Sequence, residues 1–230
     1  MDLASLTRKA WKPVVDEGDG PVGASKYSGI PWLAPGEAWP ACKNCGKPMQ
    51  LFLQLDLTTI PTELTGQFGQ GLIQLFYCTS SKPLCEDDCE SYFGKPKAMC
   101  VRLVPGGAQH GSPSTSPVAK AFGPARIVSW EALPGEHPVH CELAELGVDT
   151  AGLEDEPPGM AKPGDKVGGW PHWIQGVEYG TCAKCSKPMR LVYQIDSEDI
   201  LPYMFGDAGC GHLSQCAEHK DQLHFGWACG

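Results

Sequence analysis

Two Cys-x-x-Cys pairs have the residue types and spacing in this sequence that best indicate chemistry. The first pair is Cys42 with Cys45, and the second is Cys182 with Cys185. Such a turn projects two sulfur atoms to one side and supplies half of a tetrahedral zinc site, so each pair needs two more ligands. A single pair would also fit a thioredoxin-like redox site. A redox site has no clear reason to occur twice with the same flanking residues, so zinc binding is the better interpretation.

The remaining ligands of each zinc site are expected where a later strand returns to the Cys-x-x-Cys turn. They are Cys78 with either Cys85 or Cys89 at the first site, and Cys216 with His219 at the second, where Cys229 is the alternative to His219. Three or four thiolates leave a zinc ion no open position for water. We therefore expect Zn²⁺ at two structural sites rather than at a catalytic one.

The residues around each Cys-x-x-Cys pair recur along the chain. Residues 42–56 have the sequence CKNCGKPMQLFLQLD, and residues 182–196 have the sequence CAKCSKPMRLVYQID. At this offset of 140 residues, 13 of the 35 positions in 26–60 match those in 166–200. Unrelated sequences of ordinary composition would match at roughly two of them. The sequence therefore predicts an internal duplication of two related repeats, each with a zinc knuckle.

The predicted fold is β-rich α+β, because 28 glycines and 21 prolines indicate many turns and short elements. The duplication divides the chain into an N-terminal lead-in, a first repeat, a linker region with a short strand and helix, and a second repeat. Their boundaries are 1–25, 26–105, 106–164 and 165–230. Strands are expected at 49–57, 72–78, 99–104, 126–130, 210–216 and 225–229, and short helices at 3–11 and 140–146. A surface loop is expected at 106–123 and a flexible connection at 153–162.

Composition limits the classes of function. A hydrophobic content of 42% and a charged content of 20% predict a folded chain with a core. The net charge of −9 argues against sequence-independent binding to nucleic acid or to an anionic membrane. A basic protein partner fits that sign better, although modest acidity also simply keeps proteins soluble.

The cellular location follows from the N-terminus and the cysteines. Residues 1–15 contain no apolar run typical of a signal peptide, and no segment approaches the ~20 apolar residues of a membrane span. We therefore expect a cytoplasmic protein whose 12 cysteines stay reduced, which again favours metal binding over disulfides. The sequence does not indicate the oligomeric state.

Polar residues recur at matching places in the two predicted repeats. Gln54 and Asp56 lie at the end of a predicted strand, as do Gln194 and Asp196 in the second repeat. Such a pair could mark a groove that binds a ligand. We interpret these side chains as closing the strand ends through hydrogen bonds to turn amides.

Catalytic motifs are missing from the sequence. It contains no nucleophile elbow, phosphate-binding loop, dinucleotide glycine fingerprint or His-Glu-x-x-His pattern. An enzyme of unrecognised type is the alternative function, with a site between the repeats. Its candidate residues are Asp56, Asp196, Asp207 and His212. A thiol-based redox sensor is a third possibility.

Several segments resemble the YwqG-like family of uncharacterised bacterial proteins. They extend over almost the whole chain and comprise residues 25–33, 126–131, 166–175, 191–196, 205–211 and the terminal FGWAC. The cysteine-bearing parts are similar to programmed cell death protein 2 and its yeast ribosome-biogenesis relatives. The shared motifs, in the same order, are residues 29–33, Cys42 with Cys45, 48–49, 53–54, 76–78 and 100–105. In the second half, Cys216 and His219 replace a cysteine pair.

The resemblance implies a duplicated β-rich fold and a role in protein association. The eukaryotic relatives act as dedicated chaperones for a ribosomal protein, and YwqG-like proteins are neighbours of polymorphic toxin genes in some genomes. This chain lacks the long inserted segments of the eukaryotic proteins, so their client cannot be transferred to it. Our expectation is a zinc-binding protein-interaction module, chaperone-like or immunity-type, that binds a basic client and is not an enzyme.

Overall fold

Ten β-strands and four short helical segments form the regular structure of residues 3–89, 96–151 and 159–230, which the computed structural model describes. The strands are β1 (Ala10–Glu17), β2 (Lys26–Tyr27), β3 (Gln50–Asp56), β4 (Leu72–Tyr77), β5 (Met99–Val104), β6 (Ala125–Ala132), β7 (Lys166–Gly168), β8 (Arg190–Asp196), β9 (Cys210–Gln215) and β10 (Leu223–Ala228). The helical segments are η1 (Leu3–Leu6), η2 (Thr62–Leu64), η3 (Glu86–Cys89) and α1 (His140–Glu145). The expectation of a β-rich fold is therefore confirmed.

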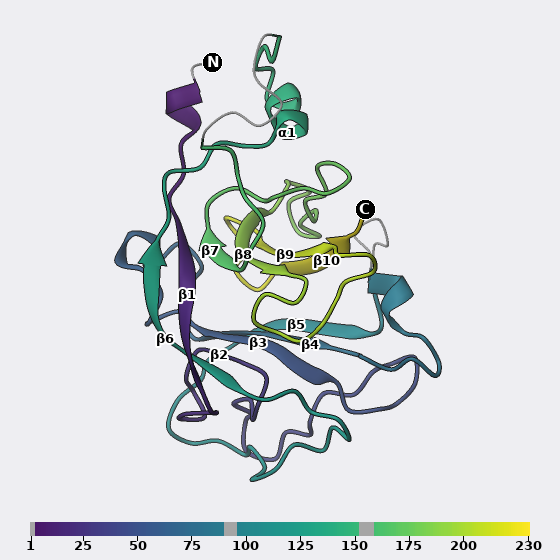
Figure 1. The fold of residues 1–230 in the computed structure, drawn as a ribbon. Helices are drawn as coiled ribbons and strands as arrows, with labels where there is room; N and C mark the ends of the chain where they lie inside the picture. The colour runs from purple at the N-terminus through teal and green to yellow at the C-terminus, as the bar shows by residue number, and fades with distance from the viewer. Residues whose placement is uncertain (1–2, 90–95, 152–158) are drawn as a thin grey trace.

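All ten strands belong to one antiparallel sheet. Their order is β10-β9-β8-β7-β1-β6-β2-β3-β4-β5, and the two end strands, β5 and β10, contact each other. The sheet is thus a nearly closed, barrel-like structure. Figure 1 shows β2–β5 along the bottom and β7–β10 above them, with β1 and β6 running past both groups at the left. We call β2–β5 the first half and β7–β10 the second half.

Corresponding glutamines hold the loops of the two halves in the same way. Gln54 in β3 accepts a hydrogen bond from the Trp32 backbone at 2.8 Å and donates to the carbonyls of residues 22 and 24. Gln194 in β8 accepts from the His172 backbone at 2.8 Å and donates to the carbonyls of residues 162 and 164. Each partner lies 140 residues after its counterpart. The interpretation that these glutamines bind loop amides is confirmed.

A buried lysine begins the first strand of each half. Lys26 in β2 and Lys166 in β7 are at most 1% exposed. Lys26 Nζ lies 2.5 Å from Asp19 Oδ1, and Lys166 Nζ lies 2.7 Å from Glu136 Oε1. A buried ammonium without such a partner would be strongly destabilising, so both pairs fix the loops that supply the carboxylates.

An aromatic cluster joins the halves in one core. Phe52 of β3 and Tyr77 of β4 stack with ring centroids 4.7 Å apart, and both contact Phe205 of the second half. The Trp227 indole N–H of β10 donates to the Tyr77 hydroxyl at 2.7 Å. These residues are at most 3% exposed. The hydrophobic face of each half is therefore buried against the other half.

The N-terminal segment differs from its prediction. Only Leu3–Leu6 is helical, as a 3-10 turn, and β1 begins at Ala10 where the sequence analysis expected a helix to residue 11. The β-branched Val14 and Val15 favour an extended chain, and Pro13 interrupts a helix. β1 pairs with both β6 and β7, so this segment connects the two halves.

Most other predicted elements are confirmed within one or two residues. The strands expected at 49–57, 72–78, 99–104 and 210–216 correspond to β3, β4, β5 and β9, and the helix expected at 140–146 corresponds to α1. The strand expected at 126–130 lies within β6, which occupies the middle of the sheet between β1 and β2. The connection expected at 153–162 lies mostly outside the described residues. No helix of the described chain has the length and apolar character needed to cross a membrane.

A buried carboxyl group lies where the halves meet. The hydroxyls of Tyr27 in β2 and Tyr193 in β8 are 2.5 Å apart. Asp165, which precedes β7, is 2% exposed and accepts a hydrogen bond from the Asp196 backbone. Burial, reinforced by the charges of Asp199 and Asp196, raises the pKa of Asp165 from its ordinary 3.8 to about 7.

This carboxyl predicts a pH-dependent stability. The folded chain holds the Asp165 proton more tightly than the unfolded chain, so stability should fall as pH rises from about 4 through 7. Asp165→Asn should remove this loss. The change that it causes in the free energy of unfolding should therefore be more favourable near pH 8 than near pH 5, by roughly 2–4 kcal/mol. Urea unfolding at both pH values measures the difference. Exposed Asp207→Asn, the control, should show no such change.

Candidate metal centres

The two Cys-x-x-Cys turns have the same backbone structure. In the first, the Cys42 amide donates to the Lys47 carbonyl at 2.9 Å, and in the second the Cys182 amide donates to the Lys187 carbonyl at 3.0 Å. The residue after the second cysteine of each turn has a positive φ, 73° at position 46 and 58° at position 186. The first position is glycine, which adopts this conformation without strain. Each turn leads directly into a strand, β3 or β8.

The first candidate site brings four cysteines together. Their ligand atoms lie within 4.8 Å of one another and belong to Cys42, Cys45, Cys78 and Cys85. Cys45 Sγ lies 3.7 Å from Cys78 Sγ, and Cys42 Sγ lies 4.0 Å from Cys85 Sγ. Sulfur atoms around a tetrahedral zinc ion with bonds of about 2.3 Å lie about 3.8 Å apart. The donor set and its spacing therefore fit a tetrahedral metal ion.

The second candidate site has three cysteines and one histidine. Cys182, Cys185, Cys216 and His219 present ligand atoms within 4.8 Å of one another. His219 Nδ1 lies 3.7 Å from both Cys182 Sγ and Cys216 Sγ, and Cys185 Sγ lies 3.7 Å from Cys216 Sγ. This arrangement also fits a tetrahedral ion, with Nδ1 of the imidazole as the nitrogen donor.

The alternatives that the sequence left open lie outside both groups. Cys89 is fully buried, and Cys229 is half-buried, next to Gly206. The spacing of Cys85 and Cys89 could not separate them, because both follow Cys78 closely; Cys85 lies just before η3 and Cys89 at its end. The other cysteines outside the groups are Cys100, Cys141 and Cys210.

Hydrogen bonds favour the thiolate form of one cysteine in each group, Cys45 in the first and Cys216 in the second. Burial alone would raise the Cys45 pKa, but hydrogen bonds from the Lys47 amide and neighbouring thiols outweigh it and lower that pKa to about 7. The His219 amide donates to Cys216 Sγ at 3.3 Å and is the main cause that lowers the Cys216 pKa to about 6. Burial raises the Cys85 pKa to about 11. A bound cation would replace the shared protons and deprotonate the remaining thiols.

Two exposed ion pairs tie together the loops of the second site. Lys184 Nζ lies 2.5 Å from Asp221 Oδ2, and Lys187 pairs with Glu218. Solvent-exposed pairs of this kind contribute about 0–1 kcal/mol each. The buried cluster here comprises only Cys182, Met189 and Cys216. Packing and surface charge therefore provide limited stability to these loops.

The candidate catalytic residues do not converge on one place. Asp56 accepts from the Thr58 backbone, and Asp196 accepts from the backbone of residues 164 and 197. His212 is buried against the Trp173 ring, with centroids 4.5 Å apart, and burial lowers its pKa to about 3. Asp207 is exposed. Each side chain thus has a local environment of its own.

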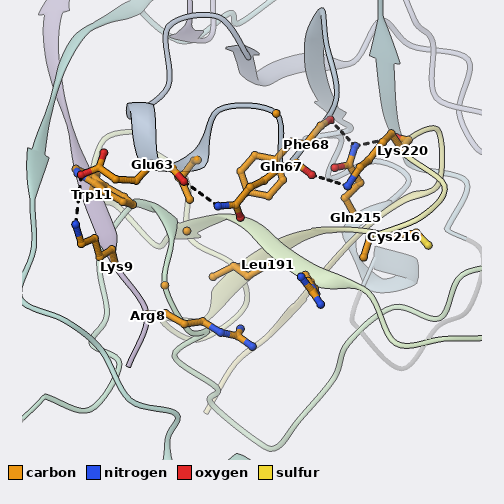
Figure 2. A pocket seen from close by; sticks show the side chains of 16 residues that line it. Arg8, Lys9, Trp11, Glu63, Gln67, Phe68, Leu191, Gln215, Cys216 and Lys220 are labelled. Carbon is orange, nitrogen blue, oxygen red and sulfur yellow. Dashed lines mark hydrogen bonds and ion pairs between the residues drawn. The ribbon is translucent and has the colours of Figure 1, made fainter. Parts of the chain in front are cut away.

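A cleft between the halves lies beside the second candidate site. Its volume is about 770 Å³, and its walls come from β1, the segment that follows β7, the loop around η2, β8 and the turn after β9. Figure 2 shows Gln67 and Phe68 of the η2 loop across from Arg8 and Leu191. Cys216 belongs to both the cleft wall and the metal-ligand group. No sequence pattern indicates this cleft, because its walls come from five separate segments.

The fold and the sites define a class of protein: a nearly closed antiparallel sheet with two four-ligand groups that could hold metal ions. The family model of a domain of unknown function, DUF1963, matches residues 25–225, and the chain belongs to that family. The match contains both ligand groups and most of the sheet. A search of curated proteins found no match to this chain.

Metal counting distinguishes the ligands from the neighbouring cysteines. Cys85→Ala and His219→Ala should each reduce the bound metal from two ions per chain to about one, because three ligands hold zinc far less tightly. Cys89→Ala and Cys229→Ala are the matched controls and should retain both ions. Native mass spectrometry provides the count. A metal lost from Cys89→Ala but kept by Cys85→Ala would contradict the first ligand group.

Stability provides a second measure of the same sites. Cys45→Ser or Cys185→Ser should lower the free energy of unfolding by several kcal/mol, since binding of a structural metal contributes directly to folding. Thermal unfolding with and without a chelator measures the effect, and the chelator should destabilise the unsubstituted protein more than either variant. Unchanged melting temperatures in both variants would show that neither site is occupied.

Proposed function

We propose that this chain is a zinc-stabilised protein-interaction module, in which two structural zinc ions hold loops beside a binding cleft. The observation that carries the proposal is the position of Cys216, which lies in the second ligand group and in the cleft wall at once. A metal ion there would fix the wall of the cleft. Its role would then be to shape a binding surface, and the chemistry of the ion itself would not be used.

The donor sets support zinc and a structural role. Four thiolates, or three thiolates and an imidazole, are typical of structural Zn²⁺ and leave no coordination position for substrate or water. Both groups have this composition. We therefore propose that the metal at both sites is zinc, as the sequence predicted, and that its role is structural.

The two halves are proposed to be copies of one ancestral unit with one zinc knuckle each. Gln54 and Gln194 make the same three hydrogen bonds to loop residues of their own halves. Each partner of Gln194 lies 140 positions after the corresponding partner of Gln54. The matching turns and the buried lysines support the same relation. A single half cannot bury its own apolar face. A second copy would cover that face, and the two copies together would form the nearly closed sheet.

The partner is proposed to be a protein client, bound in a chaperone-like or immunity-type role. The resemblance to YwqG-like proteins and to programmed cell death protein 2 is the ground for this role. The net charge of −9 is the ground for expecting a basic client. That charge describes the whole chain, and the cleft has a charge of its own.

An enzyme receives less support from the described residues. Among the described residues that line the cleft between the halves, Glu63 is the one carboxylate, and it forms an ion pair with Lys9. The candidate residues Asp56, Asp196, Asp207 and His212 are not part of the lining. Acid–base catalysis needs groups within hydrogen-bonding reach of one substrate, and the cleft does not offer such a pair.

Native mass spectrometry of the protein purified from its host tests the proposal. We expect two zinc ions per chain and a bound protein partner, which should dissociate when a chelator removes the metal. Cys185→Ser should lose the partner, and the control Cys89→Ala should keep it. A chain with two zinc ions and no partner at native expression would contradict the interaction module. Two ions with no reactive Cys-x-x-Cys thiols would exclude a redox sensor.

A further inference from the structure

The cleft between the halves has an apolar floor. Trp11, Leu64, Phe68 and Leu191 line it and are each 4–6% exposed. They come from both halves and from β1, which pairs with β7 over only two residue positions, Ala10 with Gly168 and Trp11 with Val167. Lys9 and Gly169, joined by a backbone hydrogen bond of 2.9 Å next to this pairing, also line the cleft. Its volume of about 770 Å³ is typical of pockets that enclose a ligand of several residues or a drug-sized molecule.

The rim of the cleft is cationic although the whole chain is acidic. Arg8, Lys9, Arg190 and Lys220 line it, against the single carboxylate of Glu63. Glu63 lies 3.4 Å from Lys9 and so balances that lysine. Arg190 is exposed at the start of β8 and has no ion pair within the described part of the chain. Lys220 Nζ donates to the Gln67 carbonyl at 2.5 Å, and Arg8 lies near the buried carboxylate of Glu142. The rim therefore keeps a positive charge that is centred on Arg190.

Arg8 is held in a fixed orientation at this rim. Its guanidinium carbon lies 3.1 Å from the centroid of the Trp170 ring, a stacked cation–π contact. Burial lowers the Arg8 pKa, the nearby Tyr179 and Glu142 oppose the shift, and the charge of Arg190 adds to it. The charge of Arg190 is the smallest of these effects, so the two guanidinium groups lie near enough to interact. An anionic group bound near both would be favoured by their charges.

The second metal site positions the other two cations. Lys220 follows His219 directly, and Arg190 follows Met189, which packs against Cys182 and Cys216. Gln215 further orders this wall by donating to the carbonyls of Phe68 and Lys220. The cationic rim therefore depends on the loops that the metal site would hold.

We propose that this cleft binds an acidic segment of a protein partner, with carboxylates against Arg8, Arg190 and Lys220 and an apolar side chain on the floor. The inference rests on the proposed role as an interaction module and names the chemistry that the cleft itself selects. A basic client would have to bind the acidic surface elsewhere.

Charge and shape favour a peptide over other anions. A single phosphate would fill little of the 770 Å³ volume and would leave the apolar floor without a partner. A peptide with alternating acidic and apolar side chains matches both the rim and the floor.

Peptide binding to the zinc-loaded full chain tests the inference. The probe is a capped ten-residue peptide of alternating glutamate and leucine, measured by isothermal titration at low and high salt. We expect saturable binding that weakens as salt rises, and a loss of about tenfold or more in affinity for Arg190→Glu. Lys120→Glu, an exposed lysine outside the cleft, carries the same charge change and should leave the affinity unchanged within about twofold.

The remaining outcomes overturn the inference. No binding of the acidic peptide would do so, as would equal affinities for Arg190→Glu and Lys120→Glu. A lysine-for-glutamate version of the peptide should not bind in the cleft. Tighter binding of a single-stranded oligonucleotide or of inorganic phosphate would assign the rim to another anion. If Arg190→Glu still binds the native partner, the cleft is not the binding site, although the proposed interaction module remains. The absence of any native partner would contradict the module itself.

Discussion

The mutual burial of the two half-sheets is the constraint on which the rest of the structure depends. Each half is an antiparallel sheet with one continuous apolar face and no helical layer to cover it within the described residues. The halves therefore cover each other, with Phe52 and Tyr77 packed against Phe205 and Phe225. At roughly 25 cal/mol for each Å² of apolar surface removed from water, large aromatic side chains contribute the most to such a contact. β1 and β6 then join the half-sheets edge to edge.

The second metal-ligand group lies where this core does not reach. The loops that carry Cys182 and Cys216 have a buried cluster of three residues, separate from the main core. Short loops with so little buried apolar surface need a covalent or metal link to keep one conformation. The first group differs, because Cys42, Cys78 and Cys85 also belong to the main hydrophobic cluster. The second site is therefore the one where a bound metal would have the larger effect on local order, and it is the one beside the cleft.

The cleft follows from the same geometry. β1 and β7 pair at only two positions, and residues at and beside this pairing line the cleft together with the η2 loop, β8 and the turn after β9. The concentration of Arg8, Arg190 and Lys220 at this opening is opposite in sign to the net charge of the chain. Because charges act over about 10 Å at ordinary salt, the charge of the local rim matters more for a ligand in the cleft than the net charge of the chain does.

The sequence by itself determined the local features. The two Cys-x-x-Cys turns, the strands that follow them and the glutamines that bind the loop amides could all be predicted, because each depends on short-range backbone geometry. Tertiary structure decided the choice of Cys85 over Cys89 as the neighbour of Cys42, since that depends on how the segment after β4 folds back onto the Cys-x-x-Cys turn. It also decided the place of β1 as the strand that joins both halves, and the cationic cleft. The cleft is formed by side chains from five segments, and no local pattern in a sequence records which distant residues the closed sheet brings together.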